Sequence, residues 1–258
     1  MSGRAAAAAS GPRRPSPGRA GETPPAAPAR ERTTAARIVL VRHGESQAQE
    51  GRFVGGHAGC TGLSDLGVRQ VTALRDRLAA SGELAGATTL YSSVMARAVQ
   101  TAEILAPALG ELEIESDCAF CESHPGDEAD GLDWAEFERR WPMPPEWTPK
   151  TRREPGAETF DEMRERIAAR LDLLIDRHPG ETVVVACHGG VVLHSMFRWL
   201  ELEPIGGRTR AWLDPVNSSM TEWRLAEHPH WKAGIELVRF NDHGHLQGDL
   251  LPLSRRPA

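Results

Sequence analysis

The chain alternates short runs of consecutive apolar residues with longer segments in which apolar residues recur every three or four positions. The runs Arg37–Arg42 (RIVLVR) and Thr182–Cys187 (TVVVAC) are typical of strands buried on both faces of a parallel sheet. Thr88–Tyr91 predicts a third, shorter strand, and two late strands are predicted at Ser219–Leu225 and Ile235–Phe240.

Helical spacing fills the segments between these strands. Ser64–Asp65 and Ser92–Ser93 are candidate N-caps for two helices, and the apolar residues from Phe160 to Leu174 predict a third. A fourth helix is predicted from Val191 to Leu202. Strands that alternate with helices indicate an α/β fold with a mostly parallel sheet, which we expect as a three-layer sandwich flanked by helices.

The composition divides the chain into one folded domain and two tails. Residues 1–36 are rich in Ala, Pro, Arg, Gly and Ser and contain no aromatic residue, Ile, Leu or Val, which predicts a disordered tail rather than a targeting segment. Residues 37–250 are predicted to form the folded domain, and 251–258 a C-terminal tail. Within the domain, residues 111–157 are irregular and rich in acids, Pro and Trp, as expected of an insertion or lid.

Charge and composition exclude several classes of protein. Of 258 residues, 40% are apolar and 26% charged, and no stretch reaches the roughly 18 consecutive apolar residues of a membrane span. Four cysteines are too few for a disulfide-stapled scaffold, which favours a reducing cytoplasm. The net charge is −6, and the body of the chain is more acidic than its Arg-rich start, which argues against a nucleic-acid surface. The sequence does not determine the oligomeric state, and a homodimer is one of the states it allows.

Two histidines occupy equivalent positions after predicted strands. His43 and His188 each follow an apolar run and precede glycine, so both are expected at the carboxyl edge of the sheet, where α/β folds bind ligands. Arg42 and Arg97 can present planar donors to phosphate oxygens, and the helix that follows His188 offers free amides, including that of Gly189. Together they predict a site for a small anion.

These segments resemble one known family. VRHGES (from Val41), YSSVMARAVQTAE (from Tyr91) and VVVACHGG (from Val183) are similar to the three signatures of the histidine phosphatase superfamily, in its phosphoglycerate-mutase-like branch. The segments PGAETFDEMRERI and NDHGHL also fall where that branch has similar ones. The resemblance extends over about residues 37–247.

The resemblance implies a role for each matching residue. His43 matches the nucleophile that forms a phosphohistidine, and Arg42, Arg97 and His188 match the phosphate pocket. Glu122 matches the proton donor, although other acids lie nearby in the same loop: Asp127, Glu128 and Asp130. Arginines can stabilise the charge of phosphoryl transfer without a metal or cofactor. The nucleophilic ring nitrogen of His43 must be unprotonated, which requires a backbone carbonyl to accept the proton of its other ring nitrogen.

We therefore expect a metal-independent phosphatase acting on a small phosphorylated metabolite. Phosphoglycerate mutase and a non-catalytic phosphate-ester-binding pseudo-phosphatase are the alternatives. Gln49 replaces the asparagine usual in mutases, and Arg52 is displaced by one residue from the usual arginine, although both are expected to bind phosphate or substrate. Arg139–Arg140 and Arg152–Arg153 are candidate clamps for a second anionic group, with solvated charges favoured.

Other signals are judged weaker. Cys118 and Cys121 have CxxC spacing but no second ligand pair nearby in sequence, so a zinc or redox site is not expected. The pairs His228/His230 and His243/His245 are interpreted as solvated or structural. Three tryptophans of the insertion could line a substrate cleft or pin the loop to the core: Trp134, Trp141 and Trp147.

Overall fold

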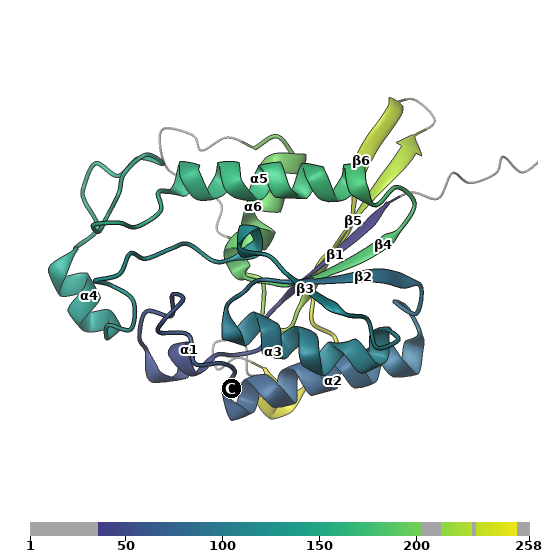
Figure 1. Ribbon diagram of the computed structural model, residues 1–258, viewed down its shortest axis with the longest axis horizontal. Helices are drawn as coiled ribbons and strands as arrows, with labels where there is room; N and C mark the ends of the chain where they lie inside the picture. Colours follow the sequence, from purple (N-terminus) through teal and green to yellow (C-terminus); the bar gives the residue numbers. More distant parts are fainter. Residues whose placement is uncertain (1–35, 203–212, 229–230, 252–258) are drawn as a thin grey trace, which may run out of the picture. The chain divides into compact units, whose positions relative to one another are not determined.

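A six-stranded, mostly parallel sheet organises the chain (Figure 1). The computed structural model describes residues 36–202, 213–228 and 231–251, so the predictions for the two tails fall almost entirely outside the described residues. The strand order is β3-β2-β4-β1-β5-β6, in which the first four strands run parallel and β5 pairs antiparallel with β1 and β6. The strands are β1 (Arg37–Arg42), β2 (Ala87–Ser92), β3 (Ile114–Ser116), β4 (Thr182–Cys187), β5 (Met220–His228) and β6 (Trp231–Asp242).

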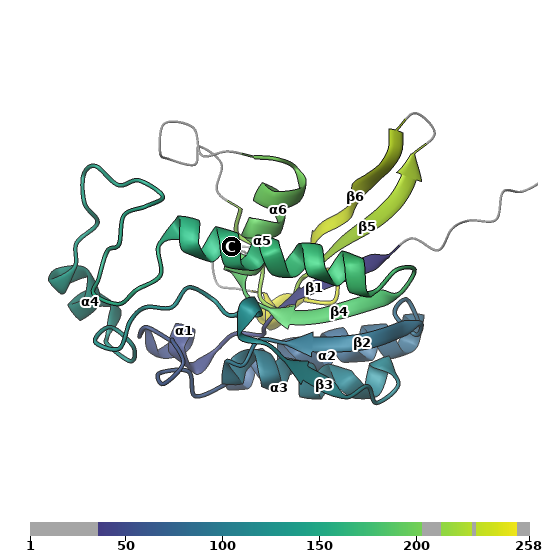
Figure 2. The same cartoon turned by 45° about the horizontal axis from the view of Figure 1, so that its top comes forward.

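Helices cover both faces of this sheet, which confirms the predicted three-layer α/β fold. Helices α2 and α3 lie on one face, and α5 and α6 on the other (Figures 1 and 2). No helix in the described ranges is long and apolar enough to cross a membrane. The helices are α1 (Gln47–Gly51), α2 (Asp65–Ser81), α3 (Ala96–Leu105), α4 (Trp134–Arg140), α5 (Phe160–Arg177) and α6 (Gly189–Trp199), with single 3₁₀ turns η1 (Ala106–Leu109), η2 (Cys118–Phe120) and η3 (Gly248–Leu250).

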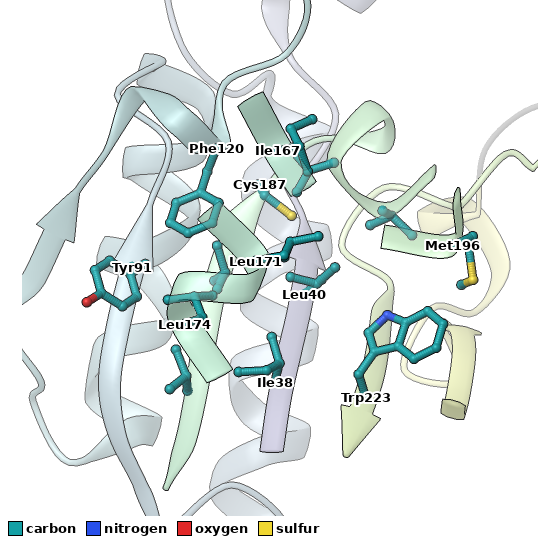
Figure 3. Packing of buried hydrophobic residues seen from close by; sticks show 14 of the residues in the cluster. Ile38, Leu40, Tyr91, Phe120, Ile167, Leu171, Leu174, Cys187, Met196 and Trp223 are labelled. Carbon is teal, nitrogen blue, oxygen red and sulfur yellow. The ribbon is translucent and has the colours of Figure 1, made fainter. Parts of the chain in front are cut away.

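Alternate residues of β1 enter two separate hydrophobic clusters, one on each face. Ile38 and Leu40 pack with α5 and α6 (Figure 3), whereas Val39 and Val41 pack with α2 and α3. All four side chains are at most 2% exposed. Burial of a side chain of this size contributes about 1.5 to 3 kcal/mol, so continuous apolar runs here specify the central strands.

The segment 111–157 contains more regular structure than its sequence predicts. It includes the short edge strand β3 and the helix α4, whose N-cap Asp133 accepts hydrogen bonds from the amides of Ala135 and Glu136. β3 has only three residues, too few to show a strand pattern. Helix boundaries also differ: α6 begins at Gly189 and ends at Trp199, before the predicted end at Leu202.

The carboxyl ends of three parallel strands meet at one edge of the sheet. Arg42 at the end of β1 is in register with Cys187 of β4, and Ser92 of β2 pairs with Ala186. The residues that follow these strands therefore emerge side by side, because parallel neighbours share direction as well as register. This edge brings His43, Ser93 and His188 together.

Candidate active site

The His43 side chain is held in one orientation by the chain around it. Its amide donates to the carbonyl of Cys187 (2.8 Å), and its ring Nδ1 lies 2.6 Å from the carbonyl oxygen of Gly44. A carbonyl only accepts, so the proton is on Nδ1 and the lone pair on Nε2. The side-chain amide of Asn217 donates to the His43 carbonyl (3.1 Å). His43 therefore presents an unprotonated Nε2.

Arg97 joins the two histidines. Its Nε–H is shared between His43 Nε2 (3.1 Å) and His188 Nδ1 (3.2 Å), while Nη1 donates to the carbonyl of Gly55 (2.8 Å). The imidazole centroids are 5.0 Å apart with an interplanar angle of 63°. The rings thus lie together beside a guanidinium, as the strand-end pattern predicted.

His188 is fixed from its other side by Ser93. Since Nδ1 of His188 accepts from Arg97, its Nε2 carries the proton and donates to Ser93 Oγ at 2.8 Å. The Ser93 hydroxyl in turn donates to Cys121 Sγ (3.3 Å). These hydrogen bonds define the tautomer of His188, which is 0% exposed.

Both imidazoles are neutral. Burial, followed by the nearby charges of Arg97 and Arg42, lowers the pKa of His43 well below its ordinary value. Burial and Arg97 likewise lower the pKa of His188. A neutral His43 keeps its Nε2 lone pair at ordinary pH, which is the form that can act as a nucleophile.

Arg42 retains an unused donor. Its Nη1 donates to the carbonyl oxygen of Pro215 and lies 3.3 Å from Asp214 Oδ1, but its buried Nε has no hydrogen-bond partner among the described residues. A buried guanidinium N–H without an acceptor costs about 1 to 3 kcal/mol. An anion in the adjoining cavity would remove that cost.

Glu122 occupies the start of α6. Its Oε2 accepts from the amide of Gly190 (3.1 Å), and Oε1 accepts from the amide of Ser123 (3.1 Å). The expectation that this helix start offers free amides to phosphate is therefore wrong at Gly190, because the Glu122 carboxyl group already accepts that N–H. Gly189 lies against the side chain of Arg42: a Cβ atom added to Gly189 would be 3.5 Å from the Nε of Arg42.

The other acids of the Glu122 loop have different surroundings. Asp130 accepts hydrogen bonds from the amides of Gly56, Ala58 and Gly59 at 2.7 to 2.9 Å, which stabilises the loop between α1 and α2. Asp127 and Glu128 are exposed and do not line the cavity. Of the four candidate acids, Glu122 alone lines it.

A cavity of about 280 Å³ opens beside these groups. Arg42, His43, Arg97 and Glu122 line it, together with aromatic residues from the loop after α1 and from α4. The buried His188 contributes through Arg97 and His43 rather than through its own surface. The described lining residues are Arg42, His43, Ser46, Ala48, Gln49, Phe53, Val54, Gly55, Gly56, Arg97, Glu122, Ser123, Pro125, Trp134, Phe137 and Glu154.

Of the two residues expected to bind phosphate or substrate, Gln49 lines the cavity and Arg52 does not. Gln49 lines the cavity, but its side chain also completes a capping box with Ser46 and accepts from Asn217 Nδ2 (3.1 Å). Arg52 is exposed in a left-handed conformation (φ 55°) as the C-cap of α1, outside the cavity. The structure thus does not bring Arg52 to the site, because the helix ends one residue before it.

The candidate clamp arginines do not line the cavity, and one of the three candidate tryptophans does. Arg139 and Arg140 pair with Glu136, Arg152 pairs with Glu162 and Arg153 with Glu138, and none of these arginines lines the cavity. Trp134 lines the cavity, whereas Trp141 packs on Phe137 and Trp147 on Phe160. Of the candidate metal pairs, His245 contacts Ser218 Oγ (2.9 Å) and His243 the Asn241 carbonyl (2.6 Å). His230 and the side chain of His228 lie outside the described residues.

Three residues of the site were not singled out from the sequence. Ser93 orients His188, and Asn217 supports His43 and Gln49. Glu154 lines the cavity with a buried Oε2 that has no hydrogen-bond partner in the described structure, and burial raises its pKa. Only Ser93 carried a signal, because it lies two residues after the predicted strand Thr88–Tyr91 and directly follows the observed β2.

A mostly parallel sheet that brings one neutral imidazole and two guanidiniums to a cavity, with a second neutral imidazole hydrogen-bonded to one of the guanidiniums, defines a phosphate-handling enzyme. The sequence matches the histidine phosphatase superfamily (branch 1) over residues 38–233. The chain therefore belongs to this family and is a phosphatase.

The chain is similar to a phosphoglycerate mutase-like protein and to a phosphatase. Phosphoglycerate mutase-like protein 4 of Arabidopsis thaliana is 30% identical over 216 residues, which cover 82% of this chain and 87% of that protein. The metal-independent phosphoserine phosphatase of the same plant is 28% identical over 190 residues, 72% of this chain and 78% of that protein. Among solved structures, Bacillus stearothermophilus YhfR superposes with a TM-score of 0.65 at 25% identity, covering 82% of this chain and 99% of that one.

Proposed function

We propose that the protein is a metal-independent phosphomonoesterase that hydrolyses a small phosphorylated metabolite through a phosphohistidine on His43. The observation that carries the proposal is the shared Arg97 Nε–H, which contacts both imidazoles while Glu122 lines the same cavity. Nucleophile, charge stabiliser and proton donor then surround one phosphoryl group.

In the first step, His43 Nε2 forms a bond to phosphorus as the ester P–O bond breaks. The Nδ1–H bond to the Gly44 carbonyl stabilises the imidazolium character that develops on the ring. Attack by Nε2 breaks its hydrogen bond with the Arg97 Nε–H. Arg97 and the unpaired Nε of Arg42 then donate to the equatorial oxygens, where the negative charge of the transition state is spread. These donors supply the electrostatic stabilisation from the chain's own residues.

Glu122 completes the reaction as acid and then as base. Its proton passes to the leaving oxygen of the ester, which would otherwise leave as an unstable alkoxide. The resulting carboxylate takes a proton from water as the water oxygen attacks phosphorus and the N–P bond breaks. Inorganic phosphate and neutral His43 are the products, and Glu122 regains its proton.

The charge of the cavity favours a phosphatase over a phosphoglycerate mutase. Among its described lining residues, Arg42 and Arg97 are the only arginines or lysines, and the mechanism uses both on the phosphoryl group. A phosphoglycerate also carries a carboxylate, for which the described lining offers no further Arg or Lys. The remaining wall, which includes Phe53, Trp134 and Phe137, suits an apolar or cationic remainder of the substrate.

The leaving-group dependence of hydrolysis tests the proposal. His43→Ala should abolish hydrolysis of an aryl and an alkyl phosphate alike, whereas Glu122→Gln should slow the alkyl ester about 10²- to 10⁴-fold and the aryl ester much less. Glu128→Gln is the matched control, because Glu128 is an exposed acid of the same loop. Added Mg²⁺ should not raise the rate.

The intermediate gives a second readout. Rapid quenching with a labelled ester should yield a phosphoenzyme that is stable in alkali, labile in acid and missing in His43→Ala. An alkali-labile adduct, or equal effects of the Glu122 and Glu128 variants, would refute the assignment. Phosphate transfer only with 3-phosphoglycerate and bisphosphoglycerate would identify a mutase instead, and ester binding without turnover a pseudo-phosphatase.

A further inference from the structure

Two cysteines and two histidines converge beside the active site. Cys118 begins the 3₁₀ turn η2 and Cys121 directly follows it. His124 comes three residues later, and His57 comes from the loop between α1 and α2. One ligand atom of each lies within 4.8 Å of the others. This corrects the sequence-based conclusion that the CxxC pair has no second ligand pair: the partners are histidines, one of them about 60 residues away.

We propose that these four side chains bind a structural zinc ion. Cys118 Sγ lies 3.4 Å from His57 Nε2 and 3.6 Å from His124 Nε2, and the two histidine rings are 4.8 Å apart between centroids. A tetrahedral zinc with ordinary Zn–S and Zn–N bonds has edges of about 3.6 Å between sulfur and nitrogen. These two sulfur–nitrogen distances are close to that value, and all four ligand atoms lie within 4.8 Å of one another.

The chemistry of the ligands selects zinc. Two thiolates with two imidazoles form a Cys₂His₂ set, which favours zinc over the hard cations that prefer oxygen. Binding replaces the two thiol protons, which are released to solvent, so that two thiolates balance the charge of the dication. Four protein ligands leave no open position for substrate, so the ion would have no part in phosphoryl transfer.

The surroundings already support such a site. Arg166 Nη1 donates to the carbonyl oxygens of Cys118, Ala119 and Cys121 at 3.0 to 3.2 Å, which fixes the turn and brings a positive charge close to both sulfurs. The Ser93 hydroxyl donates to Cys121 Sγ (3.3 Å). Hydrogen bonds from neighbouring residues to the ligand residues orient the ligands and raise metal affinity.

The ion would connect two loops that line the cavity. His57 directly follows Gly55 and Gly56, which line the cavity, and Gly55 accepts from Arg97. Glu122 and Ser123 also line the cavity and lie in the sequence between the ligands Cys121 and His124. Zinc would therefore limit the motion of the Glu122 loop relative to the arginine that contacts both imidazoles.

Metal content of the full-length chain, purified under reducing conditions without an affinity tag, tests the site. About one zinc per chain is expected by mass spectrometry of the metal, and Cys118→Ser or His124→Asn should lower it to about a tenth or less. Cys60→Ala is the matched control: Cys60 packs against the same cluster but is not one of the ligands, so zinc content should remain near one.

Cobalt substitution tests geometry without relying on variants that fold poorly. Co²⁺ added to the metal-free wild-type chain should give visible d–d bands of a tetrahedral site and sulfur-to-cobalt charge-transfer bands, and zinc should abolish them. A reduced wild-type chain that binds neither metal overturns the proposal, as does a Cys118–Cys121 disulfide in the purified protein under reducing conditions. Undiminished zinc in the ligand variants overturns it too. None of these readouts depends on the proposed hydrolysis.

Discussion

At the scale of single residues, the bonding of Arg97 decides the chemistry. One Nε–H serves two imidazoles and one Nη1 serves the Gly55 carbonyl, so three acceptors depend on a planar guanidinium. A lysine ammonium can reach one of these positions but lacks the fork that reaches them together. The residue type, and not only its charge, is therefore specified.

Arg97→Lys should lower kcat/KM for an aryl phosphate about 10²- to 10³-fold, the cost of removing a transition-state donor. Arg69→Lys provides the control, because Arg69 pairs with Asp249 at the surface and its side chain is 54% exposed. Steady-state kinetics of both variants distinguish a loss at the site from a general loss of stability. Similar kinetics for the two variants would contradict this role of Arg97.

At the scale of elements, helix α6 connects the sheet edge to the proton donor. The helix begins at Gly189, directly after β4 and His188, and its second residue donates an amide to Glu122. A Cβ on Gly190 would lie 2.2 Å from Glu122 Oε1, whereas one on Gly189 would meet nothing nearer than 3.5 Å. The start of the helix thus requires glycine at one position so that the carboxylate can approach.

Gly190→Ala should displace the Glu122 side chain while the chain stays folded, because the clash involves the flexible ends of Glu122 and Met163. Hydrolysis of an alkyl phosphate is expected to fall about 10²-fold or more, and that of an aryl phosphate much less, since only the alkyl leaving group needs the proton. Gly189→Ala should keep the leaving-group dependence of the wild type. Equal losses on both esters in Gly190→Ala would argue against Glu122 as the donor.

At the scale of the whole molecule, buried neutral histidines make stability depend on pH. Burial lowers the pKa of His43 and His188 well below the ordinary value, and lowers that of His194 and His245 to about 4. Between about pH 6.5 and the lowered pKa, the unfolded chain binds protons that the folded chain does not. The free energy of unfolding must therefore fall as the pH falls below about 6.5, while above it these groups are neutral in both states.

Each such histidine contributes a slope of about 1.4 kcal/mol per pH unit in that window. His194→Asn should remove one contribution, because His194 packs between Phe160 and Phe197 away from the cavity and an amide does not titrate. Urea unfolding of wild type and variant at several pH values from 7 to 4.5 measures the difference. An unchanged slope in the variant would show that His194 is charged in the folded protein.

Much of the fold follows from local patterns. The strands β1 and β4 have the bounds that their apolar runs predict, because a strand buried on both faces needs uninterrupted apolar residues. The edge strand β3 and the helix α4 were not predicted, since three residues show no periodicity and Asp133 alone is a weak start signal. Arg52 was misplaced because the sequence does not show where α1 ends.

The sequence by itself determined the α/β class, the central strands and the family. It also predicted that His43 and His188 meet, because strand ends in a parallel sheet emerge at a common edge, and Arg97 joins them from the start of α3. Only the tertiary structure decided which acid lines the cavity, that Glu122 and not a phosphate receives the Gly190 amide, and that His57 and His124 meet the two cysteines. These contacts join loops with no periodic pattern, whose paths depend on long-range hydrogen bonds such as those of Asp130 and Arg166.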